Sequence, residues 1–174
     1  MELPNSCQEL FLNDITDVYV YLAEDCKFSL PFNVPFQASL SNVVLPSENK
    51  CLLHITANEA LYNKLVVESA SPICCTQGSI SVKQTHALSG RITIFTYDVQ
   101  TTVEQGISSL KACIRSMNAA DNIVIIKRID GNMYLLYTLP NTFRIMVSDT
   151  DMKSANAKIN TKAMSDYIPL TLKS

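Results

Sequence analysis

The sequence predicts a β-rich α+β fold, and three observations lead to that prediction. Runs of β-branched and aromatic residues of strand length recur along the chain between turn signals. One stretch, residues 102–117, carries apolar side chains at helical spacing. The 174 residues are 47% hydrophobic and 17% charged, which suits a buried core and argues against extensive disorder. We therefore expect antiparallel strands with one packed helix.

The clearest element is a β-hairpin in the second half. Residues 122–129 and 132–139 are two β-branched, aromatic-rich runs that flank Asp130-Gly131. This pair readily adopts the positive φ angles of a type I′ turn. A third run, 142–148, follows the turn signal Pro140-Asn141. The simplest continuation is a three-stranded C-terminal β-meander.

An amphipathic helix is expected just before this hairpin, over about residues 102–117. Its apolar stripe is formed by Val103, Ile107, Leu110, Ile114 and Met117, at spacings of four, three, four and three. Thr101 and Glu104 have the spacing of a capping box at its start. The stripe is expected to pack on one face of the meander.

The first half is more interrupted. Strand-like segments are Asp17–Ala23, Cys51–Thr56, Lys64–Ser69, Ser79–Thr85 and Arg91–Tyr97. Three prolines make residues 31–50 a loop or an edge segment, because proline cannot donate to a strand ladder.

The expected organisation is a tail over residues 1–15, one β-rich domain over 16–148 and a C-terminal arm over 149–174. The arm has weak helical character at 154–163 and extended character at 168–172. A chain of this length fits one domain.

Charge and cysteine usage suggest a reducing compartment. The net charge of -2 exerts no overall attraction on nucleic acid or anionic membrane. No segment is apolar enough to span a bilayer, and the N-terminus has acidic residues where a secretory signal has positive charge. Six scattered cysteines are expected to be free thiols. We expect an intracellular protein, with the nucleus slightly favoured over the cytoplasm and no membrane insertion.

Catalytic and cofactor chemistry have little support in the sequence. His54 and His86 lie in no nucleophile, base or metal motif. The adjacent Cys74 and Cys75 would point to opposite faces of a strand, and no Cys-x-x-Cys spacing occurs. The four glycines form no phosphate-binding loop. We expect no enzyme, metal, cofactor or small-molecule substrate.

The turns of the meander suggest a register and, with it, a candidate binding surface. A two-residue Asp130-Gly131 loop pairs Ile129 with Asn132, and a two-residue Pro140-Asn141 loop pairs Leu139 with Thr142. The face opposite the helix then carries Val124, Ile126, Arg128, Met133, Leu135, Tyr137, Arg144 and Met146. The candidate partner-binding or nucleic-acid-binding residues are Arg128, Met133, Tyr137, Arg144 and Met146.

Three readings of this face remain open. The N-terminal strands can close over it as a barrel or sandwich. Alternatively, it is an exposed patch of aliphatic, Met, Tyr and Arg residues, a composition enriched at protein interfaces. In a third reading Tyr134 or Tyr137 stacks on bases of single-stranded nucleic acid while the arginines meet phosphates.

The order of three strands, a helix and a hairpin over about residues 64–139 resembles that of the OB fold. An OB-like barrel is therefore the most specific fold expected. The same order also resembles sliding-clamp halves and longin-like adaptor domains. We expect a non-enzymatic subunit of a multiprotein complex with a protein partner, whose OB-like form acts at single-stranded DNA or chromosome ends (telomeres). The alternative is a trafficking or scaffold adaptor without nucleic-acid contact.

Overall fold

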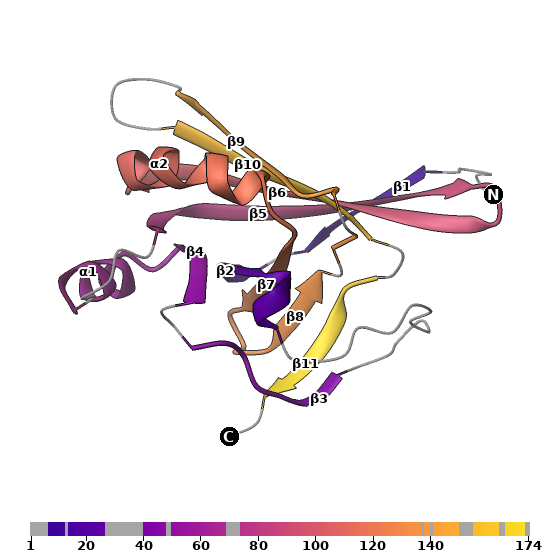
Figure 1. The fold of residues 1–174 in the computed structure, drawn as a ribbon, viewed down its shortest axis with the longest axis horizontal. Helices are drawn as coiled ribbons and strands as arrows, with labels where there is room; N and C mark the ends of the chain where they lie inside the picture. Colours follow the sequence, from indigo (N-terminus) through magenta and orange to yellow (C-terminus); the bar gives the residue numbers. More distant parts are fainter. Residues whose placement is uncertain are drawn as a thin grey trace.

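The computed structural model describes residues 7–12, 14–26, 40–47, 50–68, 74–136, 138–139, 141–149, 155–163 and 166–172. The strands are β1 (Cys7–Leu12), β2 (Ile15–Leu22), β3 (Leu40–Val43), β4 (Cys51–Thr56), β5 (Cys74–Ser89), β6 (Ile92–Gln105), β7 (Asn122–Arg128), β8 (Met133–Leu136), β9 (Arg144–Asp149), β10 (Ala155–Ala163) and β11 (Ile168–Leu172). The helices are α1 (Glu59–Glu68) and α2 (Ile107–Asn118). The prediction of a β-rich α+β fold is confirmed (Figure 1).

The strands form one mixed, open sheet. Their order is β3-β11-β8-β7-β2-β4-β5-β6-β10-β9, with β1 paired to the far end of β5. Because β3 and β9 end this order and do not pair with each other, the sheet does not close and the OB-like barrel is not confirmed. Antiparallel strands were expected, and most pairs are antiparallel, but the β4–β5 and β11–β3 pairs are parallel, so the sheet is mixed.

The β4–β5 pair is parallel because α1 lies between these strands in the chain. A parallel connection needs a long crossover, usually a helix. The segment 64–69 was expected to be a strand, but residues up to Glu68 belong to α1. The β-branched residues Val66 and Val67 favoured a strand prediction, but they lie in a helix.

The sheet folds over on itself around a large apolar core (Figure 1). Buried residues of β2, β4 and β7 meet buried residues of β6, β9 and β10 and the Leu110 and Met117 side chains of α2. A smaller core, which includes Ile123, Ile125 and Leu135, lies on the other face of β7. Both faces of β7 are therefore buried, as its almost continuous apolar sequence suggests.

The predicted meander is wrong at its third strand. β8 pairs with β7 and β11, whereas β9 pairs with β10. The partner of β9 is residues 155–163, for which helical character was expected. Alternate residues of β10 are buried, which is the period of a strand, but the buried set is mostly alanine and threonine and gave little hydrophobic signal. Strands β10 and β11, in the expected C-terminal arm, thus belong to the sheet.

The hairpin of β7 and β8 is confirmed, but its register differs by one residue. Lys127 faces Met133, and the Arg128 amide donates to the Asn132 carbonyl at 2.9 Å. The loop therefore has three residues and ends at Gly131, whose φ is +92°. A shift of one residue exchanges the faces of a whole strand. Tyr134 consequently shares a face with Ile126, and Met133 lies on the opposite face.

The α2 helix is confirmed, with a later start than expected. Thr101 and Glu104 belong to β6, so the expected capping box is wrong. The residue before the helix is Gly106, with φ +87° and no side-chain cap. A Cβ on Gly106 would lie 2.4 Å from the Cys75 carbonyl oxygen. Glycine is therefore required here both for the positive φ and for the close approach of the two backbones.

The cysteines also differ from expectation. A disulfide joins Cys74 at the start of β5 to Cys113 in α2, so the prediction of six free thiols is wrong for this pair. Cys26, Cys51 and Cys75 are free thiols.

Candidate functional site

The predicted site residues do not form one surface. Arg128 ends β7, half-buried and in register with Ile15, while Met133 is buried in the smaller core. Arg144 and Met146 are exposed on β9, and Met146 is 58% exposed. Tyr137 lies outside the described residues. Of the face proposed from the sequence, Val124 and Ile126 are covered by the large core.

Arg144 and Met146 belong to a surface that we call the outer face. It is the side of β9, β10, β6, β5 and β1 that points away from the large core. In-register partners share a face of a sheet, so the outer face can be followed from strand to strand. One row runs Met146, Lys158, Gln100, Ser81, the next runs Arg144, Asn160, Asp98, Lys83, Phe11, and a third runs Lys162, Thr96, Thr85.

The outer face carries charge opposite to that of the whole chain. Its described positions include four cations, Arg144, Lys158, Lys162 and Lys83, and three acidic residues, Asp98, Glu104 and Glu9, the last placed by its register with Thr85. Asp98 is partly neutralised, because Lys158 Nζ lies 4.0 Å from its Oδ1 and the Asn160 amide donates to the same oxygen. The chain as a whole has a net charge of -2. Positive charge is therefore concentrated on this surface.

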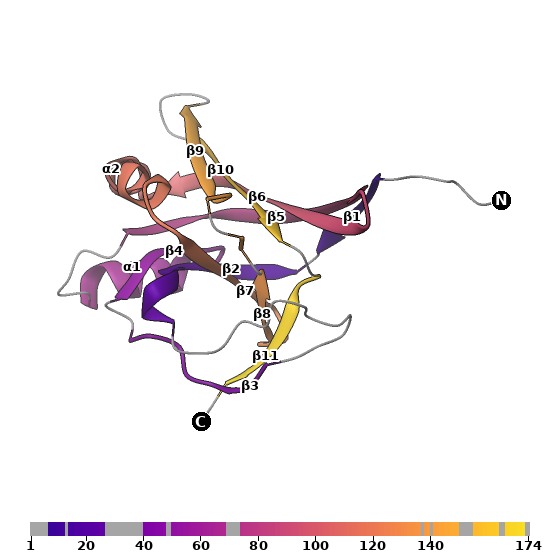
Figure 2. The same ribbon diagram turned by 45° about the vertical axis from the view of Figure 1, so that its right-hand side comes forward.

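The outer face ends on a projecting arm. The far ends of β5 and β6 extend away from the helices, with β1 alongside β5 (Figures 1 and 2). Leu88 is 64% exposed, Phe11 57% and Ile92 46%, and these three large apolar side chains lie on the arm. A hollow of about 270 Å³ is lined there by Thr85, His86, Ala87, Leu88, Ile94, Thr96 and Lys162. The hollow is smaller than the roughly 300–1,000 Å³ of small-molecule sites, and it suits a single protein side chain.

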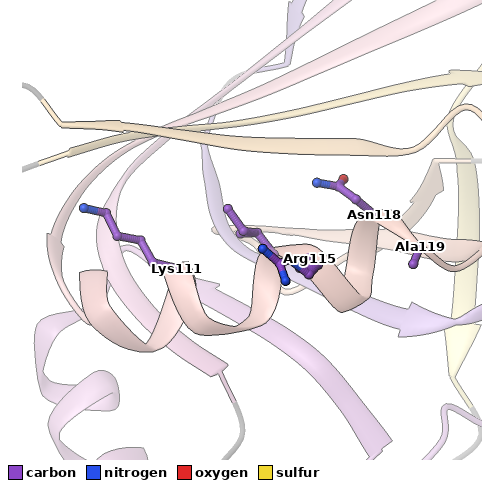
Figure 3. A pocket seen from close by; sticks show the side chains of 5 residues that line it. Lys111, Arg115, Asn118 and Ala119 are labelled. Atoms are coloured by element: carbon purple, nitrogen blue, oxygen red, sulfur yellow. The ribbon is translucent and has the colours of Figure 1, made fainter.

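A second hollow, of about 510 Å³, lies along α2. It is lined by Lys111, Ile114, Arg115, Asn118 and Ala119 (Figure 3). The Asn118 amide is already occupied: its Nδ2 donates to the Ile145 carbonyl at 3.0 Å, and its Oδ1 accepts from the Ile145 amide at 2.8 Å. Its lining residues come from α2 and the residue that follows it, Ala119, so the hollow brings no polar groups together from different elements.

The two ends of the main strand order, β9 and β3, are protected from strand addition. Asn118 occupies the backbone of β9 at Ile145. β3 has only four residues, Asn42 within it has φ +57°, and its register with β11 is irregular. Short, irregular or capped edges resist pairing with other chains. The outer face is therefore a better candidate for contact than either edge.

The only histidine–carboxylate ion pair of the described residues is a dyad between β2 and β4. His54 Nε2 lies 2.8 Å from Asp17 Oδ1, and the Thr16 hydroxyl donates to Asp17 Oδ2 at 2.8 Å. Burial by itself raises the pKa of Asp17, but hydrogen bonds from His54, Thr16 and Thr56 and the charge of His54 outweigh it and lower the pKa below 3.8. Tyr19 stacks on His54 with ring centroids 4.4 Å apart.

This dyad has no activated nucleophile beside it. The residue next to His54 on β5 is Cys75. Burial, and then the charge of Asp17, raise the pKa of the Cys75 thiol to about 11, so the thiol stays protonated at neutral pH. The dyad is best understood as a satisfied polar contact between strands. In the described ranges, moreover, no three His, Cys, Asp or Glu side chains are placed to hold a metal ion.

Sequence reasoning identified Arg144 and Met146 but missed the rest of the outer face. Lys158 and Lys162 lie in a segment read as helical, and Phe11 lies in the expected N-terminal tail. The alternation of polar residues over 156–162 was the available signal. No protein-family model, curated protein or solved structure matches the chain. None of the helices described is long and apolar enough to cross a membrane.

Proposed function

We propose that this protein is a non-enzymatic subunit of a multiprotein complex that binds an acidic protein partner on its outer face and projecting arm. The observation that carries the proposal is the concentration of four cations on one solvent-facing sheet surface of a chain that is negatively charged overall. Complementary charge steers association and selects partners.

The arm supplies the apolar part of the proposed interface. Protein interfaces combine an apolar centre, where a few anchors carry most of the binding energy, with a polar rim. Phe11 and Ile92 are exposed large apolar side chains on the outer face, and Leu88 is exposed on the opposite side of the arm. The hollow beside Lys162 accepts one partner side chain, and a carboxylate there meets the ammonium group.

A protein partner fits these residues better than single-stranded nucleic acid. Single-strand binders present a series of aromatic platforms along a cationic groove. On the described outer face Phe11 is the sole aromatic side chain, in register with Lys83. Exposed aliphatic side chains such as Leu88 and Ile92 offer nothing to phosphates. Binding of a single-stranded oligonucleotide is the competing hypothesis, and the experiment below tests it directly.

The experiment compares charge reversals of equal size on and off the outer face. Arg144→Glu with Lys162→Glu alters exposed positions of the outer face, whereas Lys64→Glu with Arg115→Glu alters exposed helical positions elsewhere. Each protein is used to capture partners from cell extract at low and raised salt, with quantitative mass spectrometry and binding of a labelled oligo(dT) measured in parallel. All three proteins should melt at similar temperatures, because exposed charges contribute little to stability.

We expect wild type and the helical variant to capture one or more acidic proteins that the outer-face variant does not capture. Less of these proteins should be captured at raised salt. Phe11→Ser with Ile92→Ser should lose the same proteins, and Val66→Ser on α1 should not. Identical captured proteins for wild type and the outer-face variant would overturn the proposal. Loss of oligo(dT) binding with no change in captured proteins would replace it by the nucleic-acid alternative.

A further inference from the structure

We propose that the Cys74–Cys113 pair is a redox switch: as a disulfide it clamps the first half of α2 to the sheet, and its reduction loosens that half without removing Leu110 from the core. This inference is independent of the outer face and of any partner. It concerns instead how α2 is attached to the large core.

The cross-link connects two elements that are distant in the chain. Cys74 is the buried first residue of β5, and Cys113 is half-buried in the middle of α2. Their Cα atoms are 6.7 Å apart and 39 residues separate them in sequence. Because Cys113 is only half-buried, a small reductant can approach the bond from the helix side.

The two halves of α2 are anchored unequally. The last turn is held by Met117, which is fully buried, and by the two hydrogen bonds of Asn118 with Ile145. The first turn follows Gly106, has no side-chain cap and contains no acidic residue to complement the helix dipole. This half is held by the fully buried Leu110, by Ile107, which packs against the large core, and by the disulfide. Loss of the disulfide should therefore act on residues 107–113.

Reduction can be written with a dithiol as the electron donor. One thiolate of the dithiol attacks a sulfur of the pair, forms a mixed disulfide and releases the other cysteine, which takes up a proton. The second thiol of the donor then displaces the remaining cysteine. The protein gains two electrons and two protons, and the dithiol becomes a disulfide.

The remaining described thiols are poor partners for exchange. Burial is the main cause that raises the pKa values of Cys26, Cys51 and Cys75, each to about 11. A protonated thiol is not a nucleophile. Cys75, although adjacent in sequence to Cys74, points to the opposite face of β5. The pair is therefore insulated from internal scrambling.

The test combines cysteine mapping with hydrogen exchange. The denatured wild type, alkylated with and without prior reduction by dithiothreitol, should gain two adducts on reduction, located at Cys74 and Cys113 by peptide mapping. In the native protein, peptides covering 107–113 should exchange roughly tenfold faster after reduction, while peptides covering β10 keep their rate. Cys113→Ser should show the fast rate with or without reductant, and Cys51→Ser should respond to reductant as wild type does.

Two results would overturn the inference. The first is full alkylation of Cys74 and Cys113 without reductant in protein prepared under air. The second is a disulfide whose reduction leaves exchange in 107–113 unchanged. If Cys113→Ser does not fold, wild type with and without dithiothreitol still gives both the alkylation result and the exchange rate of residues 107–113.

Discussion

The side chain of Asn118 completes both backbone hydrogen bonds of Ile145, at 3.0 Å and 2.8 Å, and so takes the place of a neighbouring strand on β9. This contact joins the end of α2 to the edge of the sheet. It also blocks the position at which another chain would add a strand.

Asn118→Ala is therefore expected to have two effects. The free energy of unfolding should fall by about 1–3 kcal/mol, because two backbone groups lose their partner. The uncovered edge should also favour self-association. Urea unfolding measures the first effect and sedimentation velocity over a range of protein concentrations measures the second. Ser108→Ala, an exposed change on the same helix, should do neither. A variant that is as stable and as monomeric as wild type would show that Asn118 does not protect the edge.

The buried stripe of α2 gives a second prediction. Leu110 is fully buried in the large core, so Leu110→Asp places an unpaired charge there and should abolish soluble folding. Ser108→Asp, on the exposed side, should change stability by no more than about 0.5 kcal/mol. Soluble expression and circular dichroism compare the two. A folded Leu110→Asp protein would mean that this side of α2 does not face the core.

Gly106 and Gly131 form a matched pair for a third prediction. Both have positive φ, +87° and +92°, so alanine costs about 1–2 kcal/mol of backbone strain at either position. At Gly131 a Cβ meets nothing within 4 Å, whereas at Gly106 it collides with the Cys75 carbonyl. Gly106→Ala should therefore destabilise the protein clearly more than Gly131→Ala in urea unfolding. Equal losses would contradict the close approach of β6 and β5 before α2.

The Asp17–His54 dyad gives a prediction about pH. The folded-state pKa of Asp17 lies below its ordinary value of 3.8, so the carboxylate contributes stability above about pH 4. That contribution is lost as the pH falls through the lowered pKa. Asp17→Asn should lack this acid-dependent part of the stability profile and should be less stable at neutral pH by about 1–3 kcal/mol, because the buried hydrogen bonds to the carboxylate from His54 and Thr16 are lost or weakened.

Urea unfolding of wild type and Asp17→Asn across pH 3–7 tests this prediction. Lys158→Gln, which removes the exposed partner of Asp98, serves as the control because it alters an ion pair on the surface. If the two stability profiles run parallel down to the lowest pH, Asp17 is not the group whose titration matters.

The local signals in the sequence were sufficient for elements whose structure depends on near neighbours. Strand β4 has the bounds expected from its β-branched run, the β7–β8 hairpin forms around Asp130-Gly131, and α2 follows its apolar stripe. In each case the structure follows from a turn signal or from the regular spacing of apolar residues within a short segment. Arg144 and Met146 do share an exposed side of β9, but the meander register from which they were chosen does not form.

Only the tertiary structure decided which strands became neighbours. β9 follows β8 in the chain but pairs with β10, and the paired residues Ile145 and Ile159 are both buried in the large core. Lys158, Lys83 and Phe11 came onto one face with Arg144 through this order, and Cys113 came beside Cys74 for the same reason. Strand pairing and core closure are contacts between residues far apart in sequence, so the residue pattern of one segment determines its own period but leaves its partner open.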